Sequence, residues 1–451
     1  MRTIDRLRLE NLLHDEEGRF HTEHLKSHKL YQRAKQSMQG GVPMLWMIRW
    51  AGTFPVFVKD AKGAHFTDVD GHTYIDFCLG DTGAMTGHAP EATLAAINAQ
   101  AGKGITLMLP TEDAIWVGEE LQQRFGLKYW QFTLTATDAN RFAVRMARHI
   151  TNRKKILVFN YCYHGSVDET FITLDDEGTP CSRYGNLGPP VNPVETTKVI
   201  EFNDIPALEI ALSARDVAVV LAEPVMTNIG IIHPDPGYHE ALRNITDRNG
   251  TLLIIDETHT LCTGPGGYTA KYGLKPDFLT CGKSLAGGIP AGVYGFTQEV
   301  ADAFWEKLEV DQSDVGGIGG TLAGNALSIS AMRATLEHVL TPSMYTRCER
   351  LADLYEAGVI DVIKEFDLPW IVKRLGFRVE YWFRQTPPRN GGEANAAVDS
   401  KLDRFMHLWA LNRGILMTPF HNMALIAADT NDADVDYHTR IFREAVQTLI
   451  G

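Results

Sequence analysis

A lysine in a glycine-rich segment is the first residue of this sequence whose surroundings suggest chemistry. Lys283 lies in LTCGKSLAGGIPAG, one glycine after a short apolar run. Small neighbours would let a bulky planar ligand approach the backbone, and a lysine amine that is partly removed from water can attack a carbonyl. Most lysines in such loops have no chemical role, so this signal alone is weak.

Two further candidates follow apolar runs that are typical of buried strands. Asp256 closes the strand-like run in TLLIIDETHT, where a buried carboxylate is costly unless a cation pairs with it. The segment 161–165 (YCYHG) follows KILVFN, and an aromatic ring at that edge of a sheet can stack on a planar ligand. A helix cap and a structural aromatic are the ordinary alternatives.

A fourth feature is the helix predicted from TLTATDANRFAVRMARHI, for which Thr137 is the expected cap, with Asp138 in the first turn. A helix start preceded by small residues offers free backbone N–H groups to an anion. The alternative is an ordinary capped helix. One face of this helix is apolar and comprises Ala139, Phe142, Ala143, Met146 and Ala147.

Together the four features supply what pyridoxal 5'-phosphate needs from a protein. The helix start would hold the phosphate, the aromatic would stack on the ring, and Asp256 would keep the ring nitrogen protonated. Lys283 would form the Schiff base and then carry a proton between the substrate carbon and the cofactor. The sequence therefore predicts an enzyme that carries pyridoxal 5'-phosphate on Lys283.

The order and spacing of these motifs resemble class III (subgroup II) aminotransferases of PLP fold type I, over about residues 30–451. Within that family the chain resembles the glutamate-1-semialdehyde aminomutase-like and β-amino-acid aminotransferase branch. Ala136 and Ala326 replace a glycine and a proline of the family motifs. The matching segments are 135–139 (TATDA), 163–165 (YHG), 222–224 (AEP), 256–258 (DET), Lys283 and 320–326 (GTLAGNA).

The resemblance implies a homodimer with shared active sites, because the family's threonine at position 321 binds the phosphate of the neighbouring subunit. It implies Lys283, Asp256 and Tyr163 as the catalytic residues, with Tyr163 stacked on the ring and Asp256 at its nitrogen. The implied cofactor contacts are Ala136, Thr137, Tyr163, His164, Glu223, Asp256, Lys283 and Thr321.

The family reaction is ping-pong transamination, and the expected substrate here is an amine or β-amino acid donor with an oxo-acid or ketone acceptor. The expected substrate contacts are Trp46, Met47, Arg49 and His421, with Trp46, Met47 and Tyr163 forming an apolar, aromatic pocket. A substrate carboxylate would meet an arginine, and Arg49, Arg374 and Arg378 are the candidates, although a structural role is the ordinary expectation for each.

Two other functions stay open. An aminomutase of the glutamate-1-semialdehyde type would return the amine to the same molecule, and the segment GGV at 40–42 favours it slightly. A non-catalytic regulator that binds the cofactor is a more remote alternative, because such proteins usually carry a DNA-binding module and no basic stretch suggests one here.

The elements that must position these residues read as an α/β fold with a mainly parallel mixed sheet. Short apolar runs without polar alternation alternate with helical segments, which predicts buried strands joined by helical crossovers. These runs are 155–159, 217–225, 251–257, 277–283 and 292–296.

Three regions are expected along the chain. Residues 1–80 read as an N-terminal segment with helical character up to about residue 40 and an antiparallel meander that turns at Lys62-Gly63 and Asp70-Gly71. Residues 81–334 read as the large cofactor-binding domain, with a long loop at 161–199. Residues 335–451 read as a small α+β domain that contains GFRVEYWF, GILMTPF and NMALIA.

Bulk composition narrows the class of protein. The 451 residues are 44% hydrophobic and 22% charged, with a net charge of −13, which argues against disorder and against a duplex nucleic-acid binder. Six irregularly spaced cysteines without a C-x-x-C pair predict free thiols and neither a zinc site nor disulfides. Without a signal peptide or membrane-spanning run, a cytoplasmic enzyme with no metal and no membrane partner is expected.

Overall fold

The computed structural model describes residues 4–308 and 313–451. Packing separates the chain into two compact units. The large unit comprises residues 91–345 and 388–396, and the terminal unit comprises the chain through residue 90 together with 346–387 and 397–451. The three-part division at residues 80 and 334 stays a prediction.

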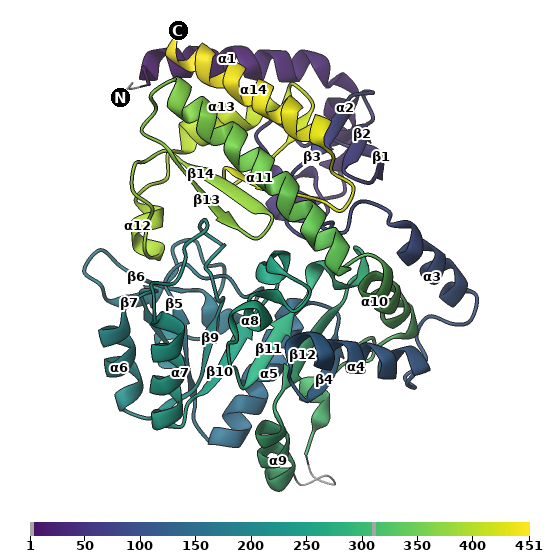
Figure 1. Cartoon of the computed structure of the whole chain (residues 1–451), viewed down its shortest axis with the longest axis vertical. Helices are drawn as coiled ribbons and strands as arrows, with labels where there is room; N and C mark the ends of the chain where they lie inside the picture. The colour runs from purple at the N-terminus through teal and green to yellow at the C-terminus, as the bar shows by residue number, and fades with distance from the viewer. Residues whose placement is uncertain (1–3, 309–312) are drawn as a thin grey trace. The chain divides into compact units, whose positions relative to one another are not determined.

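A seven-stranded sheet organises the large unit, with the strand order β4-β12-β11-β10-β9-β5-β8 (Figure 1). β12 runs antiparallel to β11 and β4, and the remaining pairs are parallel. The predicted mainly parallel mixed sheet is confirmed, and each of the five predicted runs contains a strand. The strands are β4 (Tyr129–Thr133), β5 (Lys155–Phe159), β8 (Thr197–Ile200), β9 (Val217–Ala222), β10 (Leu252–Asp256), β11 (Phe278–Cys281) and β12 (Gly292–Phe296).

Two strands at the edges, β4 and β8, have no counterpart among the predicted runs. β4 (YWQFT) alternates exposed and buried residues instead of forming an apolar run, and β8 (TKVI) begins inside the segment predicted as a loop. That segment also holds a short antiparallel pair, β6 (Ile172–Leu174) and β7 (Pro180–Ser182). The segment 161–199 is otherwise irregular, as expected of a long loop, and this local pairing satisfies part of its backbone.

Helix α5 (Ala136–Thr151) packs across the central strands and carries the apolar face predicted for it. Its buried alanines and Met146 form one hydrophobic cluster with residues of β5, β9, β10, β11 and β12, while Phe142 is partly buried. The other helices of the large unit are α3 (Glu91–Ala101), α4 (Glu112–Phe125), α6 (Ile205–Ser213), α7 (Tyr238–Asn249), α8 (Gly267–Tyr272), α9 (Gln298–Lys307), α10 (Ala326–His338) and α12 (Gly391–Asn395).

The terminal unit contains two small sheets. The predicted meander is confirmed as β1 (Val58–Lys62), β2 (His65–Asp68) and β3 (Thr73–Asp76). The segment GILMTPF contains the strand β15 (Ile415–Leu416), which pairs in parallel with β3 and so joins the meander's sheet. The second sheet comprises β13 (Ile371–Leu375), β14 (Arg378–Trp382) and β16 (Met423–Leu425).

Helices from both ends of the chain belong to the terminal unit. α1 (Arg6–Glu23) and α2 (Leu25–Ala34) confirm the helical character of the first 40 residues. The C-terminal helices are α13 (Ser400–Leu411) and α14 (Asp432–Ile450), and α11 (Pro342–Glu365) begins in the large unit.

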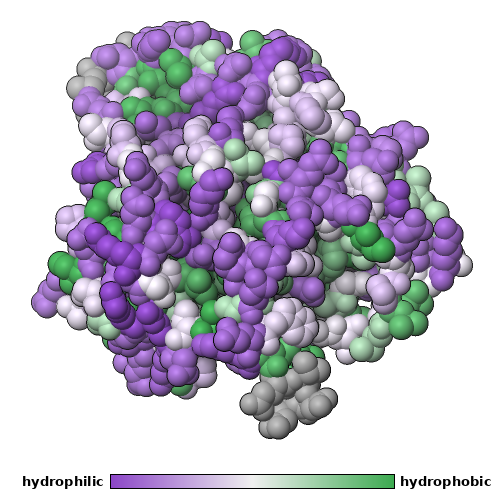
Figure 2. Space-filling view, turned by 60° about the horizontal axis from the view of Figure 1, so that its bottom comes forward, coloured by the Kyte–Doolittle hydropathy of each residue, from purple (hydrophilic) through white to green (hydrophobic). Residues whose placement is uncertain are grey.

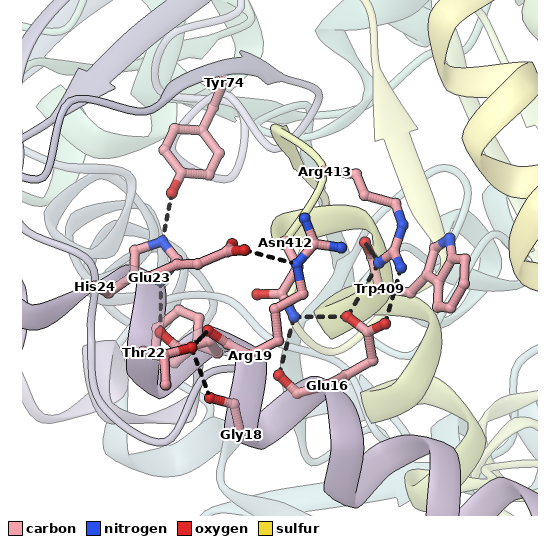
Figure 3. A network of polar contacts seen from close by, with 11 residues as sticks. Glu16, Gly18, Arg19, Thr22, Glu23, His24, Tyr74, Trp409, Asn412 and Arg413 are labelled. Atoms are coloured by element: carbon pink, nitrogen blue, oxygen red, sulfur yellow. Dashed lines mark hydrogen bonds and ion pairs between the residues drawn. The ribbon is translucent and has the colours of Figure 1, made fainter.

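A buried ion pair joins α1 to the end of α13 in the terminal unit (Figure 3). Glu16 accepts hydrogen bonds from Arg413 Nη2 at 2.9 Å and from Asn412 Nδ2 at 2.7 Å. The Arg413 guanidinium lies 3.3 Å from the centre of the Trp409 ring. Because a buried charge that loses its partner is costly, this network fixes α1 against α13.

The surface and the thiols agree with the composition. Hydrophilic residues dominate the face drawn in Figure 2, and hydrophobic residues gather there in small groups. All six cysteines are free thiols, as predicted. Among the described helices, none has both the length and the apolar character needed to cross a bilayer.

Candidate active site

The first turn of α5 has free backbone N–H groups, which are the groups that an anion would need. Thr135, and not Thr137 as predicted, caps the helix, because its hydroxyl accepts from the Asp138 N–H at 3.2 Å. The backbone N–H groups of Ala136 and Thr137 precede the helix's own hydrogen bonds and stay available to an anion.

The predicted aromatic segment packs directly on this turn. The Thr137 hydroxyl accepts from the Ser166 N–H at 3.1 Å. Gly165 has φ +75°, and a Cβ placed on it would lie 1.9 Å from Thr137 Oγ1. Only glycine permits this approach, so the YHG sequence at 163–165 is held against the start of α5.

Asp256 lies at the end of β10, almost fully buried, and is the centre of a hydrogen-bond network. Its Oδ2 accepts from His164 Nδ1 and from Asn140 Nδ2, each at 2.9 Å, and its Oδ1 accepts from the Thr258 N–H at 3.1 Å. A carboxylate offers about four acceptor positions, so a further donor can still bind.

This network keeps Asp256 ionised. Burial alone would raise the pKa of the Asp256 carboxyl, but the hydrogen bond and charge of His164, together with Thr258 and Asn140, hold that pKa below its ordinary value. Burial alone would lower the pKa of the His164 imidazole. The Cys162 sulfur and the Asp256 carboxylate outweigh this effect and raise that pKa. The result is a buried pair of opposite charges.

Asn140 is a site residue that the sequence reasoning missed. It is fully buried, donates to Asp256 and to the His164 carbonyl, and accepts from Thr280 Oγ1 at 2.6 Å. An available signal was its position on the apolar face of α5, one turn before Ala143 and Val144, where an amide needs polar partners.

Lys283 follows β11 at the start of a short 3-10 helix (Lys283–Ala286) and is half-buried. Its Nζ lies 2.8 Å from Nε2 of His259, a second residue that the sequence reasoning missed. Gly282 lies so close to the start of α5 that a Cβ on it would be 2.9 Å from the Ala136 backbone nitrogen. This close approach requires a glycine at position 282. The same approach places the residue before Lys283 against the first turn of α5.

Glu223 contributes a carboxyl without a full set of partners. The residue is nearly buried, Thr227 Oγ1 donates to its Oε2, and its Oε1 has no hydrogen-bond partner among the described residues. Burial raises the pKa of Glu223 to about 7, although the charge of nearby His164 opposes the rise. A hydrogen-bond donor of a ligand beside this oxygen would remove the free-energy cost of leaving it buried without a partner.

Two predicted cofactor contacts lie at more open positions. Tyr163 is 42% exposed, with its ring edge-on to Phe171 at a centroid distance of 6.4 Å. Thr321 is exposed in the turn that precedes α10. In the described part of the chain, Thr321 makes no hydrogen bond to the other predicted residues, so its role in a partner's site stays a prediction.

The predicted substrate contacts lie in the terminal unit. The Trp46 ring meets Phe420 edge-on at 4.6 Å, and the Arg49 guanidinium lies 5.7 Å from the centre of the same ring. Met47 is half-buried beside Trp46, and His421 Nδ1 lies 3.6 Å from Glu380 Oε1. Aromatic rings and one exposed guanidinium therefore gather around Phe420.

The other two candidate arginines are used within the terminal unit. Arg374 pairs with Asp353 and donates to the Gly376 carbonyl at 2.6 Å. Arg378 is buried, donating to Met423 Sδ at 3.0 Å and to Thr82 Oγ1 at 2.5 Å. Both sets of contacts have the character of structural roles.

One cluster in the terminal unit has the residue types of a metal site: His24, Asp68 and His72. Their polar atoms already bind one another. His72 Nδ1 lies 3.0 Å from Asp68 Oδ2, and the Tyr74 hydroxyl donates to the same oxygen at 2.9 Å. Tyr74 Oη also lies 2.7 Å from His24 Nε2 (Figure 3). These contacts account for the cluster as a hydrogen-bond network.

The residues of the large unit fit a phosphorylated, aldehyde-bearing pyridine. The start of α5 suits a phosphate, the anionic Asp256 suits a protonated ring nitrogen, and the Lys283 amine suits an aldehyde. The buried, unpartnered Glu223 Oε1 adds an acceptor for a polar ring substituent.

Comparison with known proteins agrees with this geometry. The family model for class-III aminotransferases matches residues 46–436. The glutamate-1-semialdehyde 2,1-aminomutase 2 of Brevibacillus brevis is 32% identical over 421 residues, which cover 91% of this chain and 96% of that protein.

Solved structures are similar over nearly the whole chain. A glutamate-1-semialdehyde-aminomutase from Pseudomonas aeruginosa is 48% identical, with a TM-score of 0.97 and 99% of both chains covered, and a lysine-to-alanine variant of it was solved in complex with PMP. A β-phenylalanine aminotransferase from Variovorax paradoxus is 25% identical, with a TM-score of 0.85 and 97% of both chains covered.

Proposed function

Because the chain belongs to the class-III aminotransferase family, whose members use pyridoxal 5'-phosphate, we propose that it is a glutamate-1-semialdehyde 2,1-aminomutase. In that reaction the amine on carbon 2 of the substrate moves to carbon 1, and the carbonyl moves the other way. The observation that carries the proposal is the 48% identity to the Pseudomonas aeruginosa protein over 99% of both chains. The sequence alone favoured amine transfer between two molecules, with the aminomutase reaction as the alternative. The similarity to known aminomutases now favours the aminomutase reaction.

Besides Lys283, four residues of the large unit would hold the cofactor. The backbone of Ala136 and Thr137 would bind the phosphate, Asp256 would pair with the pyridine nitrogen, and Tyr163 would stack on the ring. His164 supports Asp256 from behind through its 2.9 Å contact. We expect Thr321 to reach the phosphate of a partner subunit in a homodimer.

The bound cofactor supplies an aldehyde that bonds to amines and a ring that draws electrons from the carbon bearing the amine. Asp256 favours that withdrawal, because a carboxylate held ionised stabilises a protonated ring nitrogen. Lys283 anchors the cofactor and, when its amine is released, holds or moves a proton at Nζ.

The reaction is tested by supplying glutamate-1-semialdehyde to the holoenzyme without any other amine or oxo acid. We expect conversion to the isomer with the amine on carbon 1. Mass spectrometry and NMR of the product measure this conversion. A substrate that turns over only when a separate donor or acceptor is added would refute the mutase proposal.

A second candidate is transfer between two molecules, with an amine or β-amino acid as donor. The cluster of Trp46, Phe420 and Arg49 favours it, because two aromatic rings and a guanidinium suit a substrate with an apolar group and a carboxylate. A panel of α-, β- and ω-amino acids with pyruvate and 2-oxoglutarate, followed at the cofactor absorption band, decides between the two reactions.

The attachment residue is tested separately. Wild-type protein should show the visible absorption of bound pyridoxal 5'-phosphate, and Lys283→Ala should shift or remove that band. Treatment with borohydride should fix the cofactor to the peptide that contains Lys283. A labelled peptide elsewhere in the chain would contradict this assignment.

A further inference from the structure

We propose that His259 is a positioning residue for Lys283, and that its Nε2 accepts a hydrogen bond from the Lys283 ammonium whenever this amine is not bonded to the cofactor. The proposal rests on the proposed role of Lys283 as the attachment residue. Its basis is the contact of 2.8 Å between Lys283 Nζ and His259 Nε2.

The register of the central sheet brings the two residues together. β10 and β11 are parallel, and Asp256 is paired with Thr280. His259 and Lys283 each lie three residues beyond that pair, so their loops leave the same edge of the sheet side by side. The contact therefore follows from the sheet itself.

Both loops are held in place by other contacts. Glu257 accepts from the Tyr268 N–H at 3.0 Å, and the Cys262 thiol donates to the His259 carbonyl at 3.3 Å. On the other loop, Gly282 lies against Ala136, and Lys283 itself has φ +55°. A left-handed backbone at a non-glycine residue marks a position that the surrounding structure determines.

The chemistry of the two nitrogens sets the direction of the hydrogen bond. An ammonium nitrogen can only donate hydrogen bonds, and the unprotonated nitrogen of a neutral imidazole accepts them. The Lys283 ammonium therefore donates and His259 Nε2 accepts. A free lysine side chain samples many rotamers, so this contact holds the released amine in one place for its return.

The proposal predicts how easily a small amine displaces Lys283. Methylamine would form the C=N bond to the cofactor's aldehyde carbon as the bond to Nζ breaks. Its two N–H protons would pass to Nζ, and one further proton from solvent would make Nζ an ammonium. His259 stabilises only the released ammonium, so its loss should make displacement harder. One hydrogen bond to a charged group corresponds to a change of about 10-fold or more.

The experiment titrates holoenzyme with methylamine, traps each mixture with borohydride, and measures the fraction of Lys283 peptide that carries the cofactor by mass spectrometry. His259→Phe should raise the methylamine concentration at half displacement about 10-fold or more. His259→Gln, whose amide oxygen can accept from the ammonium, should stay near wild type. His149→Phe is the matched control, because His149 is exposed on α5 and contacts Phe304.

A half-displacement concentration in His259→Phe within about twofold of wild type would overturn the proposal. If His259→Phe fails to fold, His259→Leu is judged by the same criterion. Loss of cofactor from a folded variant also overturns it, because a residue that acts on the released amine is not needed for loading. Cofactor trapped on a residue other than Lys283 would instead refute the attachment assignment, which keeps the two failures distinct.

Discussion

Asp256 illustrates how single residues set the chemistry of this site. A carboxylate at the end of a buried strand would ordinarily be protonated or costly, but here His164, Asn140 and Thr258 all donate to it. The surrounding donors, and not exposure to water, keep the charge in place. The same donors make the aspartate difficult to replace by alanine, since His164 would then keep a buried charge without a partner.

Asp256→Asn therefore tests the charge with the smallest change in packing. We expect the rate to fall by about 100- to 1000-fold, because the electrostatic support of the ring nitrogen is lost. Steady-state kinetics and the position of the cofactor band are the measurements. Asp277→Asn is the control, because Asp277 is also a largely buried carboxylate of this sheet region and binds Arg243 at 2.9 Å. Equal losses in both variants would contradict a specific role of Asp256.

Glu223 should make the stability of the apoprotein depend on pH. Burial raises its pKa from 4.5 to about 7 in the folded chain, so the folded state binds the proton more tightly than the unfolded state. Its contribution to the unfolding free energy therefore falls as pH rises from 4.5 to 7 and stays low above that. Glu223→Gln should gain up to about 3 kcal/mol over wild type at pH 8 and much less at pH 4.5. Urea unfolding at both values measures this, and a difference that does not change with pH would contradict it.

At the scale of elements, the site depends on how loops at one edge of the sheet meet the start of α5. The YHG loop after β5 and the glycine before Lys283 both approach this helix more closely than a side chain allows. The strand register fixes which loop residues face each other. The elements therefore act as a rigid frame, and the glycines determine how closely the loops approach.

Gly165→Ala should disturb this frame strongly. The new Cβ would lie 1.9 Å from Thr137 Oγ1, in a backbone with φ +75°, so we expect a loss of about 2–5 kcal/mol in unfolding free energy and weaker cofactor binding. Gly126→Ala is the matched control, because Gly126 has φ +78° and open space around it. It should lose only about 1–2 kcal/mol. Thermal unfolding and cofactor titration compare the two, and equal losses would show that the contact with Thr137 is unimportant.

At the scale of the whole molecule, the expected homodimer would complete each site with Thr321 of a partner subunit. Mixing two inactive variants tests this. Heterodimers of Lys283→Ala and Thr321→Ala subunits should regain about one working site per dimer, because the subunit with Lys283 receives an intact Thr321 from its partner. Activity and cofactor content after mixing are the measurements. No recovery in verified heterodimers would place Thr321 in the site of its own chain.

Several features could be predicted because they depend on local sequence. The strands at 155–159 and 292–296 are apolar runs with defined ends, and the structure reproduces both. The two edge strands were harder to predict from the sequence. β4 alternates exposed and buried residues, and β8 follows a segment of irregular structure. Strand β15 could not be foreseen, because its parallel partner β3 lies more than 300 residues earlier in the chain.

The sequence by itself determined the family, the cofactor and the sheet class, because motif spacing and buried apolar runs are local properties. Only the tertiary structure decided that Asn140 and His164 hold the charge of Asp256, and that His259 meets Lys283. These three contacts join residues 116, 92 and 24 positions apart along the chain, and strand register and helix packing bring them together. The physical reason is that hydrogen bonds and charge pairs depend on distances in space, which spacing along a sequence does not specify.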